Sequence, residues 1–229
     1  MSLSGKSPFY FENTELYKRF SETEDFQGKI VSLLGPILKD KVVLDVGCGS
    51  GKYLKLFAPY AKKMIGIDHS PYQIEHAKKQ TKNLKNTQAM EEKAEALPFA
   101  EKEFDIIFAS WVLGTIPQKR VQKKAVLEMK RVLKKGGTLL LVENDSKGSF
   151  EWIRGRATNG SGPTNDYNRW LIEKNDFVIH KKMKTCFQFE SLKEAKRVFG
   201  GIWGDSAAKK IKKSHIAHDL IILKYVKID

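Results

Sequence analysis

The sequence has little of what marks secreted, membrane-spanning or metal-binding proteins. Its 229 residues include only two cysteines, Cys48 and Cys186, far apart and in neither a disulfide framework nor a metal-ligand spacing. The longest largely apolar stretch, 106–116, is well short of the roughly 20 residues that a membrane-spanning helix needs. No basic segment followed by an apolar run opens the chain, so no signal peptide is expected. These absences favour a cytoplasmic protein with no membrane span and no metal site.

Acidic residues are scarce relative to basic ones. The chain carries 41 Lys and Arg against 27 Asp and Glu, a formal net charge of +14. This excess favours an acidic partner, nucleic acid above all. The basic residues gather in several segments, including 119–135 and 196–229, and Lys is more frequent than Arg. Solvated helix faces are therefore the alternative explanation, because Lys is less suited than Arg to bidentate reading of bases.

The hydrophobic pattern indicates one sizeable α/β domain. With 41% hydrophobic and 30% charged residues, the chain can fold around a core. Helical spacing of apolar residues in the first forty residues gives way to alternating strands and helices. Strands are predicted at 42–44, 64–67, 105–109, 138–142, 177–180 and 218–226. Because several of these runs are apolar throughout, a parallel sheet between two helix layers is expected, with the last two strands forming a hairpin-like edge.

Glycine pairs and glycine-rich segments predict where helices end and loops lie. The helix of 123–133 is expected to end at Gly136-Gly137, and the helix of 192–199 at Gly200-Gly201. The segment 146–166 reads as a long loop, and long loops in compact domains often cover or bind ligands.

The sharpest feature is a glycine loop between a strand and a helix, Asp45-Val46-Gly47-Cys48-Gly49-Ser50-Gly51. Glycines let the backbone approach a ligand closely, and a following helix offers free N–H groups. Asp45, before the first glycine, would repel a pyrophosphate but favour a cationic amino group. Asp68 lies at the end of the next strand, where an acidic side chain can accept hydrogen bonds from ribose hydroxyls.

Four segments in order resemble class I S-adenosylmethionine-dependent methyltransferases, specifically the subgroup similar to ubiquinone and menaquinone biosynthesis enzymes. They span about 41–142 and are the glycine loop, 66–71 (Gly-Ile-Asp-His-Ser-Pro), 94–99 (Ala-Glu-Ala-Leu-Pro-Phe) with 104–107 (Phe-Asp-Ile-Ile), and 132–137 (Val-Leu-Lys-Lys-Gly-Gly). The resemblance implies a Rossmann-like, doubly wound, mostly parallel seven-stranded sheet with an antiparallel last strand. It also implies an N-terminal helical cap over 1–40 and a methyltransferase domain over 41–229, with the cofactor-binding core at 41–145.

The resemblance assigns S-adenosylmethionine (SAM) as cofactor and S-adenosylhomocysteine as product, and it implies roles for particular residues. Gly47, Cys48 and Gly49 are expected at the methionine part of the cofactor, with Asp45 favouring its ammonium. Asp68 is expected to hold the ribose, with His69, Ala94 and Glu95 around the adenine. Ser110 and Trp111 end the fourth strand and are expected near the sulfonium, and Tyr17 in the cap is a further candidate contact.

Two positions differ from the usual pattern of the family that the sequence resembles. Lys93 stands where relatives usually carry an Asp that bonds the adenine amino group, and Gly114-Thr115 stands where they often carry Glu-His. The second pair tends to line the acceptor pocket, so the usual acceptor chemistry is not implied.

Methyl transfer from a sulfonium is an in-line displacement with a good neutral leaving group, so positioning and exclusion of water are the protein's main tasks. A base is needed only for an acceptor that must lose a proton early. Glu143, Asp145 and His69 are weak candidates, and solvated or capping side chains are the commoner alternative for each. Aromatic residues of the cap and loop, namely Tyr10, Phe11, Phe20, Trp152 and Tyr167, could line the site or simply pack.

The sequence therefore predicts a SAM-dependent methyltransferase with an unidentified, small-molecule acceptor. Two alternatives remain: an RNA or protein methyltransferase that uses the basic surface, and a regulatory protein that binds SAM without catalysis.

Overall fold

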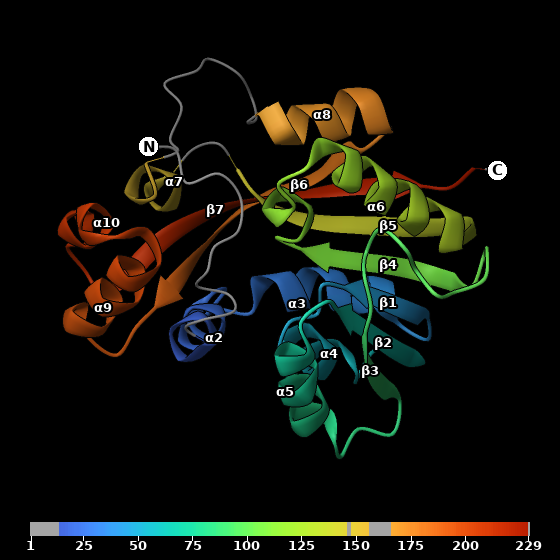
Figure 1. Ribbon diagram of the computed structural model, residues 1–229, viewed down its shortest axis with the longest axis horizontal. Coiled ribbons are helices and arrows are strands. Elements are labelled where there is room, and N and C mark those ends of the chain that lie inside the picture. Colours follow the sequence, from blue (N-terminus) through green and yellow to red (C-terminus); the bar gives the residue numbers. More distant parts are fainter. Residues whose placement is uncertain (1–13, 146–147, 156–165, 229) are drawn as a thin grey trace.

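The computed structural model describes residues 14–145, 148–155 and 166–228 and shows a mixed seven-stranded sheet between two helix layers (Figure 1). The strand order is β3-β2-β1-β4-β5-β7-β6. Strands β1 to β5 run parallel to one another, whereas β7 is antiparallel to both β5 and β6. The strands are β1 (Val42–Val46), β2 (Lys63–Asp68), β3 (Thr87–Glu91), β4 (Phe104–Ser110), β5 (Leu133–Asn144), β6 (Val178–Gln188) and β7 (His215–Val226).

This sheet confirms the predicted fold class, including the antiparallel last strand and the pairing of the final two strands. The helices are α2 (Thr14–Thr23), α3 (Lys29–Leu34), α4 (Lys52–Phe57), α5 (Pro71–Thr81), α6 (Lys119–Val132), α7 (Ser149–Ile153), α8 (Asp166–Asn175), α9 (Leu192–Trp203) and α10 (Asp205–Lys210), with short 3-10 turns η1 (Gly35–Leu38) and η2 (Leu113–Thr115).

Two apolar clusters fill the two sides of the sheet. Alternate residues of the central strands divide between them, as the two-residue repeat of a strand requires: Leu139 and Leu141 belong to one cluster and Leu140 and Val142 to the other. The first cluster is covered by α6 and α8, and the second by α3, α4 and α5 (Figure 1).

A third apolar cluster lies beyond the sheet. Strands β6 and β7 extend past the end of β5, and α2, α7, α9 and α10 gather around this extension (Figure 1). Aromatic side chains dominate the cluster, with Phe150, Phe187 and Phe199 buried and Phe20 and Trp203 packed against them. The end of β5 and the carboxyl edge of the sheet are thus bordered by a lobe made from both ends of the chain.

Three expectations from the sequence were wrong, and one strand was not predicted. Gly136-Gly137 lies inside β5 rather than at a break, because the helix already ends at Val132. Gly200-Gly201 lies inside α9, which continues to Trp203. Five residues of the expected loop form α7. Strand β3 did not emerge from the pattern, because this edge strand is mostly polar and only Ala89 is buried.

Candidate active site

The glycine loop lies at the carboxyl ends of the parallel strands, between β1 and α4. Gly47, Gly49 and Gly51 all have left-handed backbones, with φ of 73°, 52° and 89°. The Gly47 and Cys48 amides donate to the Ile67 carbonyl at 2.7 and 2.9 Å, which joins the loop to the end of β2. A Cβ at Gly47 would lie 2.3 Å from a methyl group of Val112, so the segment after β4 packs directly on the loop.

Asp68 organises the loop from the end of β2. One carboxylate oxygen accepts the Gly49 amide at 3.0 Å, and the other accepts the Ser70 amide at 2.9 Å. The side chain is buried, while the neighbouring His69 ring is largely exposed, with its Nδ1 3.6 Å from the Asp68 carboxylate. The bracing of the glycine loop by Asp68 is a role that the sequence did not reveal.

Asp45 is the most unusual group of the site. It is 1% exposed, and neither carboxylate oxygen has a hydrogen-bond partner among the described residues. Burial, with a smaller contribution from Asp68, raises its pKa to about 8. A buried carboxyl without donors costs free energy unless a ligand or water supplies them. Asp45 is therefore suited to a cationic or hydrogen-bond-donating group that enters the edge of the sheet.

Helix α2 reaches this edge from the N-terminal side. Burial raises the pKa of the Tyr17 phenol, and the negative charges of Glu24 and Asp68 raise it further. Lys52, the first residue of α4, donates to the carbonyls of Ser21 and Glu24 at 2.7 and 2.6 Å. The helix after the glycine loop thus holds the last turn of α2.

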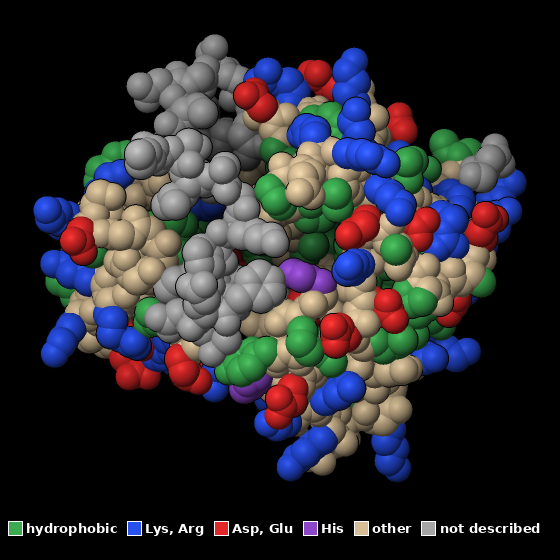
Figure 2. All heavy atoms as spheres, in the orientation of Figure 1, with side chains coloured by type: hydrophobic (Ala, Val, Ile, Leu, Met, Phe, Trp, Pro, Cys, Tyr) green, Lys and Arg blue, Asp and Glu red, His purple; other side chains and the backbone are tan. Residues whose placement is uncertain are grey.

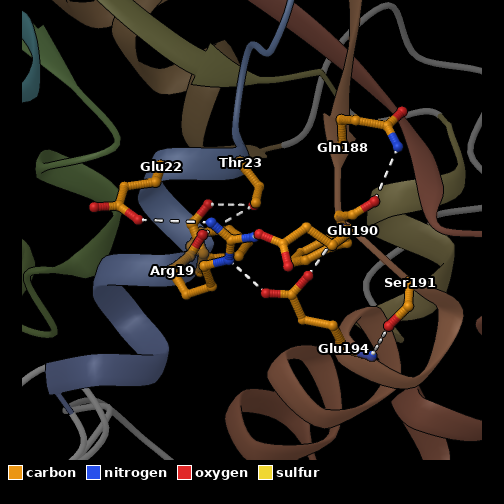
Figure 3. Close-up of polar contacts among 9 residues, drawn as sticks. Arg19, Glu22, Thr23, Gln188, Glu190, Ser191 and Glu194 are labelled. Carbon is orange, nitrogen blue, oxygen red and sulfur yellow. Dashed lines mark hydrogen bonds and ion pairs between the residues drawn. The ribbon is translucent and has the colours of Figure 1, made fainter.

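The other side of α2 is joined to the lobe by Arg19 (Figure 3). Its guanidinium contacts Glu194 of α9 and also Glu190, the latter at 2.6 Å. Because Glu194 is mostly covered and also accepts the Glu190 amide, the arginine faces a fixed pair of carboxylates. These contacts place α2 between the glycine loop and α9.

The end of β4 meets β5 and β7 through a buried polar chain. Trp111 has a left-handed backbone, φ 55°, and its indole donates to Asn144 Oδ1 at 2.9 Å. His218 Nε2 lies 2.7 Å from the same oxygen. Because that oxygen can only accept, Nε2 carries the proton, and burial keeps the pKa of His218 well below its usual value. Neutral His218 and Asn144 therefore fix the indole of Trp111.

The three candidate bases have different surroundings. Glu143 is buried, accepts the Tyr167 hydroxyl at 2.9 Å, and has a pKa raised by burial to about 8. A solvated or capping role is therefore wrong for Glu143. Asp145 is buried as well but lies 2.9 Å from Lys182 Nζ, whereas the ring of His69 is mostly exposed.

The segment after β3 lies beside Asp68. The Glu92 amide donates to the Asp68 carbonyl at 3.0 Å, and the Ala96 amide donates to the Lys93 carbonyl at 3.1 Å. Ala94 and Glu95 are half-buried, whereas the Lys93 side chain points into solvent. The candidate adenine residues thus lie at the same edge as the two aspartates.

Several polar groups beside the glycine loop and the end of β4 have no signal in the sequence. They come from segments far apart in the chain: Glu24 and His218 are buried, and Lys52, Asn144 and Arg154 are half-buried. Nothing in their spacing marks them, because they meet only through the fold.

The aromatic candidates divide by position. Phe20 and Trp203 pack in the third cluster, whereas Trp152 is 52% exposed beneath Lys210. Tyr10, Phe11 and most of the glycine-rich segment lie outside the described residues. Within the described ranges, no group of three or more His, Cys, Asp or Glu could hold a metal, and no helix is long and apolar enough to cross a membrane.

Comparisons with known proteins agree with this geometry. The family profile described as a methyltransferase domain matches residues 44–141. An uncharacterized methyltransferase, YcgJ of Bacillus subtilis, is 34% identical over 153 residues, covering 62% of this chain and 56% of that protein. A demethylmenaquinone methyltransferase of Staphylococcus carnosus is 33% identical over 111 residues, covering 47% and 44%. The chain thus spans about half the length of the curated relatives it matches.

Solved structures share the fold over most of the chain. The YcgJ crystal structure superposes with a TM-score of 0.61 at 21% identity, covering 87% of this chain and 98% of that one. The N-methyltransferase NodS of Bradyrhizobium japonicum, in complex with S-adenosylhomocysteine, gives 0.60 at 17% identity, covering 90% and 88%. The matched segment 44–141 carries the glycine loop, both aspartates and the end of β4. Residues 44–141 are therefore similar to a methyltransferase domain, and the chain shares the fold of solved methyltransferase structures over most of its length.

Proposed function

We propose that this protein binds SAM at the carboxyl edge of the sheet and transfers its methyl group to a small acceptor. The observation that carries the proposal is Asp45: a buried carboxyl with no donor among the described residues, beside three left-handed glycines and Asp68. SAM carries an ammonium and a sulfonium, which suit a carboxylate, and ribose hydroxyls, which suit Asp68.

The remaining roles follow from position. Gly47, Cys48 and Gly49 would border the methionine part, and Asp68 would accept the ribose hydroxyls. His69, Ala94 and Glu95 would surround the adenine, where Lys93 offers only its backbone. Ser110 and Trp111 would lie by the sulfonium, and Tyr17 of α2 would cover the cofactor from the cap formed within 1–40. Bound SAM supplies the electrophilic methyl group, while these residues orient it and exclude water.

A small acceptor is supported by the polar groups buried at the edge. Asn144 and His218 fix Trp111 from inside, and α2 lies over the same edge, held through Lys52 and Arg19. Lys and Arg are spread over the visible face and interleaved with Asp and Glu (Figure 2). This scatter favours solvated helix faces over a single track for nucleic acid.

An RNA or protein acceptor remains the second candidate because of one groove. It lies between α6 and α8, measures about 490 Å³, and is lined by Lys119, Lys123, Leu127, Trp170, Lys174 and Asn175. Lysines beside an aromatic ring are a feature of surfaces that bind single-stranded nucleic acid. The Lys119 ammonium also lies 5.9 Å from the Tyr167 ring, next to Glu143.

Calorimetric titration with SAM and with S-adenosylhomocysteine tests the proposal. We expect both to bind the unmodified protein, and Asp68→Ala to weaken both at least roughly tenfold, because a hydrogen bond to a charged group contributes about 1.5–3 kcal/mol. The matched control is Asp205→Asn at the exposed start of α10. Undetectable binding of SAM to the unmodified protein would refute both the hypothesis of a methyltransferase and that of a regulatory SAM-binding protein. Tight binding without methyl transfer would leave only the regulatory one.

A further inference from the structure

Glu143 lies where β5 passes the end of β4. Val142 pairs with Ser110, and the Trp111 amide donates to the Val142 carbonyl at 2.9 Å. Glu143 therefore follows directly after the residue that pairs with the end of β4, where the proposed function puts the sulfonium. Only 5% of Glu143 is exposed.

The side chain of Glu143 points toward α6 and α8. Leu141, two residues earlier, belongs to the core cluster on that side, and side chains two apart in a strand share a face. There the Tyr167 hydroxyl donates to one carboxylate oxygen, Oε1, at 2.9 Å. The other oxygen, Oε2, has no hydrogen-bond partner among the described residues, so one half of the carboxylate is held and the other is available.

Glycine keeps the space beside Oε2 open. A Cβ built on Gly114 would lie 3.9 Å from Oε2 and 3.9 Å from the Tyr167 ring. Gly114 is exposed, whereas the carboxylate behind it is buried. An acceptor that entered over Gly114 would thus meet Oε2 beside the end of β4.

We propose that Glu143 is the base that takes the proton from the methyl acceptor, and that this acceptor presents a phenolic hydroxyl or a thiol. The inference rests on the proposed function. An oxygen or sulfur lone pair of the acceptor forms the bond to the methyl carbon as the carbon–sulfonium bond breaks. The electrons of that bond stay on sulfur, which leaves as a neutral thioether, and the acceptor proton moves to Oε2.

The charged and titratable groups around Glu143 set the pH range of this step. Burial raises its pKa to about 8, while the Tyr167 hydrogen bond and the Arg154 guanidinium, after α7, oppose the rise. Lys119 Nζ of α6 lies 5.9 Å from the centre of the Tyr167 ring. The base works only when ionised, so methyl transfer to such acceptors should increase as pH rises through 8.

The test uses the full chain, SAM labelled in the methyl group, and three probes: a catechol, an aryl thiol and a primary amine. We expect transfer to the catechol or the thiol, and Glu143→Gln to reduce its kcat by roughly 100-fold or more, as for loss of a general base. SAM affinity, measured by calorimetry, should change less than about twofold. Glu173→Gln, on the exposed face of α8, is the matched control and should transfer at the unmodified rate.

A second variant distinguishes a role of Glu143 as the base from a role that is only structural. Tyr167→Phe removes a donor that stabilises the carboxylate, so the midpoint of the pH–rate profile should move to higher pH. Unchanged kcat in Glu143→Gln, or an unmoved midpoint in Tyr167→Phe, would overturn the assignment. Label on the amine alone, or on no probe while SAM binds, would also overturn it. Failure of SAM to bind the unmodified protein would instead overturn the proposed function.

Discussion

If SAM binds beside Asp45 as proposed, its binding should release a proton that can be measured. With a pKa of about 8, the buried carboxyl carries a proton in most of the free protein at pH 7. A difference of one unit corresponds to about ten protonated molecules for each ionised one. The ammonium of SAM favours the ionised form, so binding should release a proton, about 0.9 per SAM at pH 7. Affinity should fall as pH decreases below 8, by up to about tenfold per unit.

Calorimetry in two buffers with different ionisation enthalpies measures this proton directly. The matched variant is Asp45→Asn, which keeps the ligand's own titration and removes only that of Asp45. We expect the variant to release markedly less proton and to lose more affinity at pH 8.5 than at pH 6.5. Equal proton release in the two proteins, or unchanged affinity at both pH values, would refute the role given to Asp45.

Three further predictions follow from the same geometry. Gly47→Ala should abolish measurable SAM binding, because the new methyl group would lie 2.3 Å from a methyl group of Val112. Gly136→Ala is the control, because Gly136 has a similar φ but open space around it. This control should bind SAM normally and lose about 1–2 kcal/mol of stability. In the absence of ligand, thermal stability should decrease as the pH is raised from 6.5 to 8. In this range the carboxyl groups of Asp45 and Glu143 are still protonated in the folded protein but ionised in the unfolded chain. Each group therefore lowers the free energy of unfolding by about 1.4 kcal/mol for each pH unit of increase. The dependence of stability on pH should be weaker in Asp45→Asn. Lys123 lines the groove between α6 and α8, so Lys123→Glu should weaken any retention of RNA on filters at low salt. Methyl transfer to small molecules should be unchanged. Loss of RNA retention together with loss of methyl transfer would favour an RNA acceptor.

The sequence predicted the sheet well because its signals are local. Apolar runs such as 138–142 mark strands buried on both faces, and the glycine loop requires left-handed backbones that Gly47, Gly49 and Gly51 supply. Signals from single glycine pairs misled, because Gly136 adopts a left-handed backbone within β5 and the pair is held there by hydrogen bonds to Lys227, so it does not end the strand.

The surroundings of the site depended on contacts between distant segments. Lys52 meets Glu24 and His218 meets Asn144 only after β7 and α2 reach the edge of the sheet. The burial of Glu143 has the same origin, since α8 covers it from 24 residues away. Residue type and spacing do not indicate such contacts, so the glycine loop was predictable whereas the surroundings of Glu143 and Trp111 were not.

The central claim is that SAM bound at this edge donates its methyl group to a small acceptor. The most direct measurement incubates the full chain with methyl-labelled SAM and separate pools of metabolites, RNA and protein, with Asp68→Ala as the inactive control. The account predicts label in the metabolite pool, dependent on Asp68. Label confined to RNA or protein, or no transfer to any pool despite SAM binding, would contradict it.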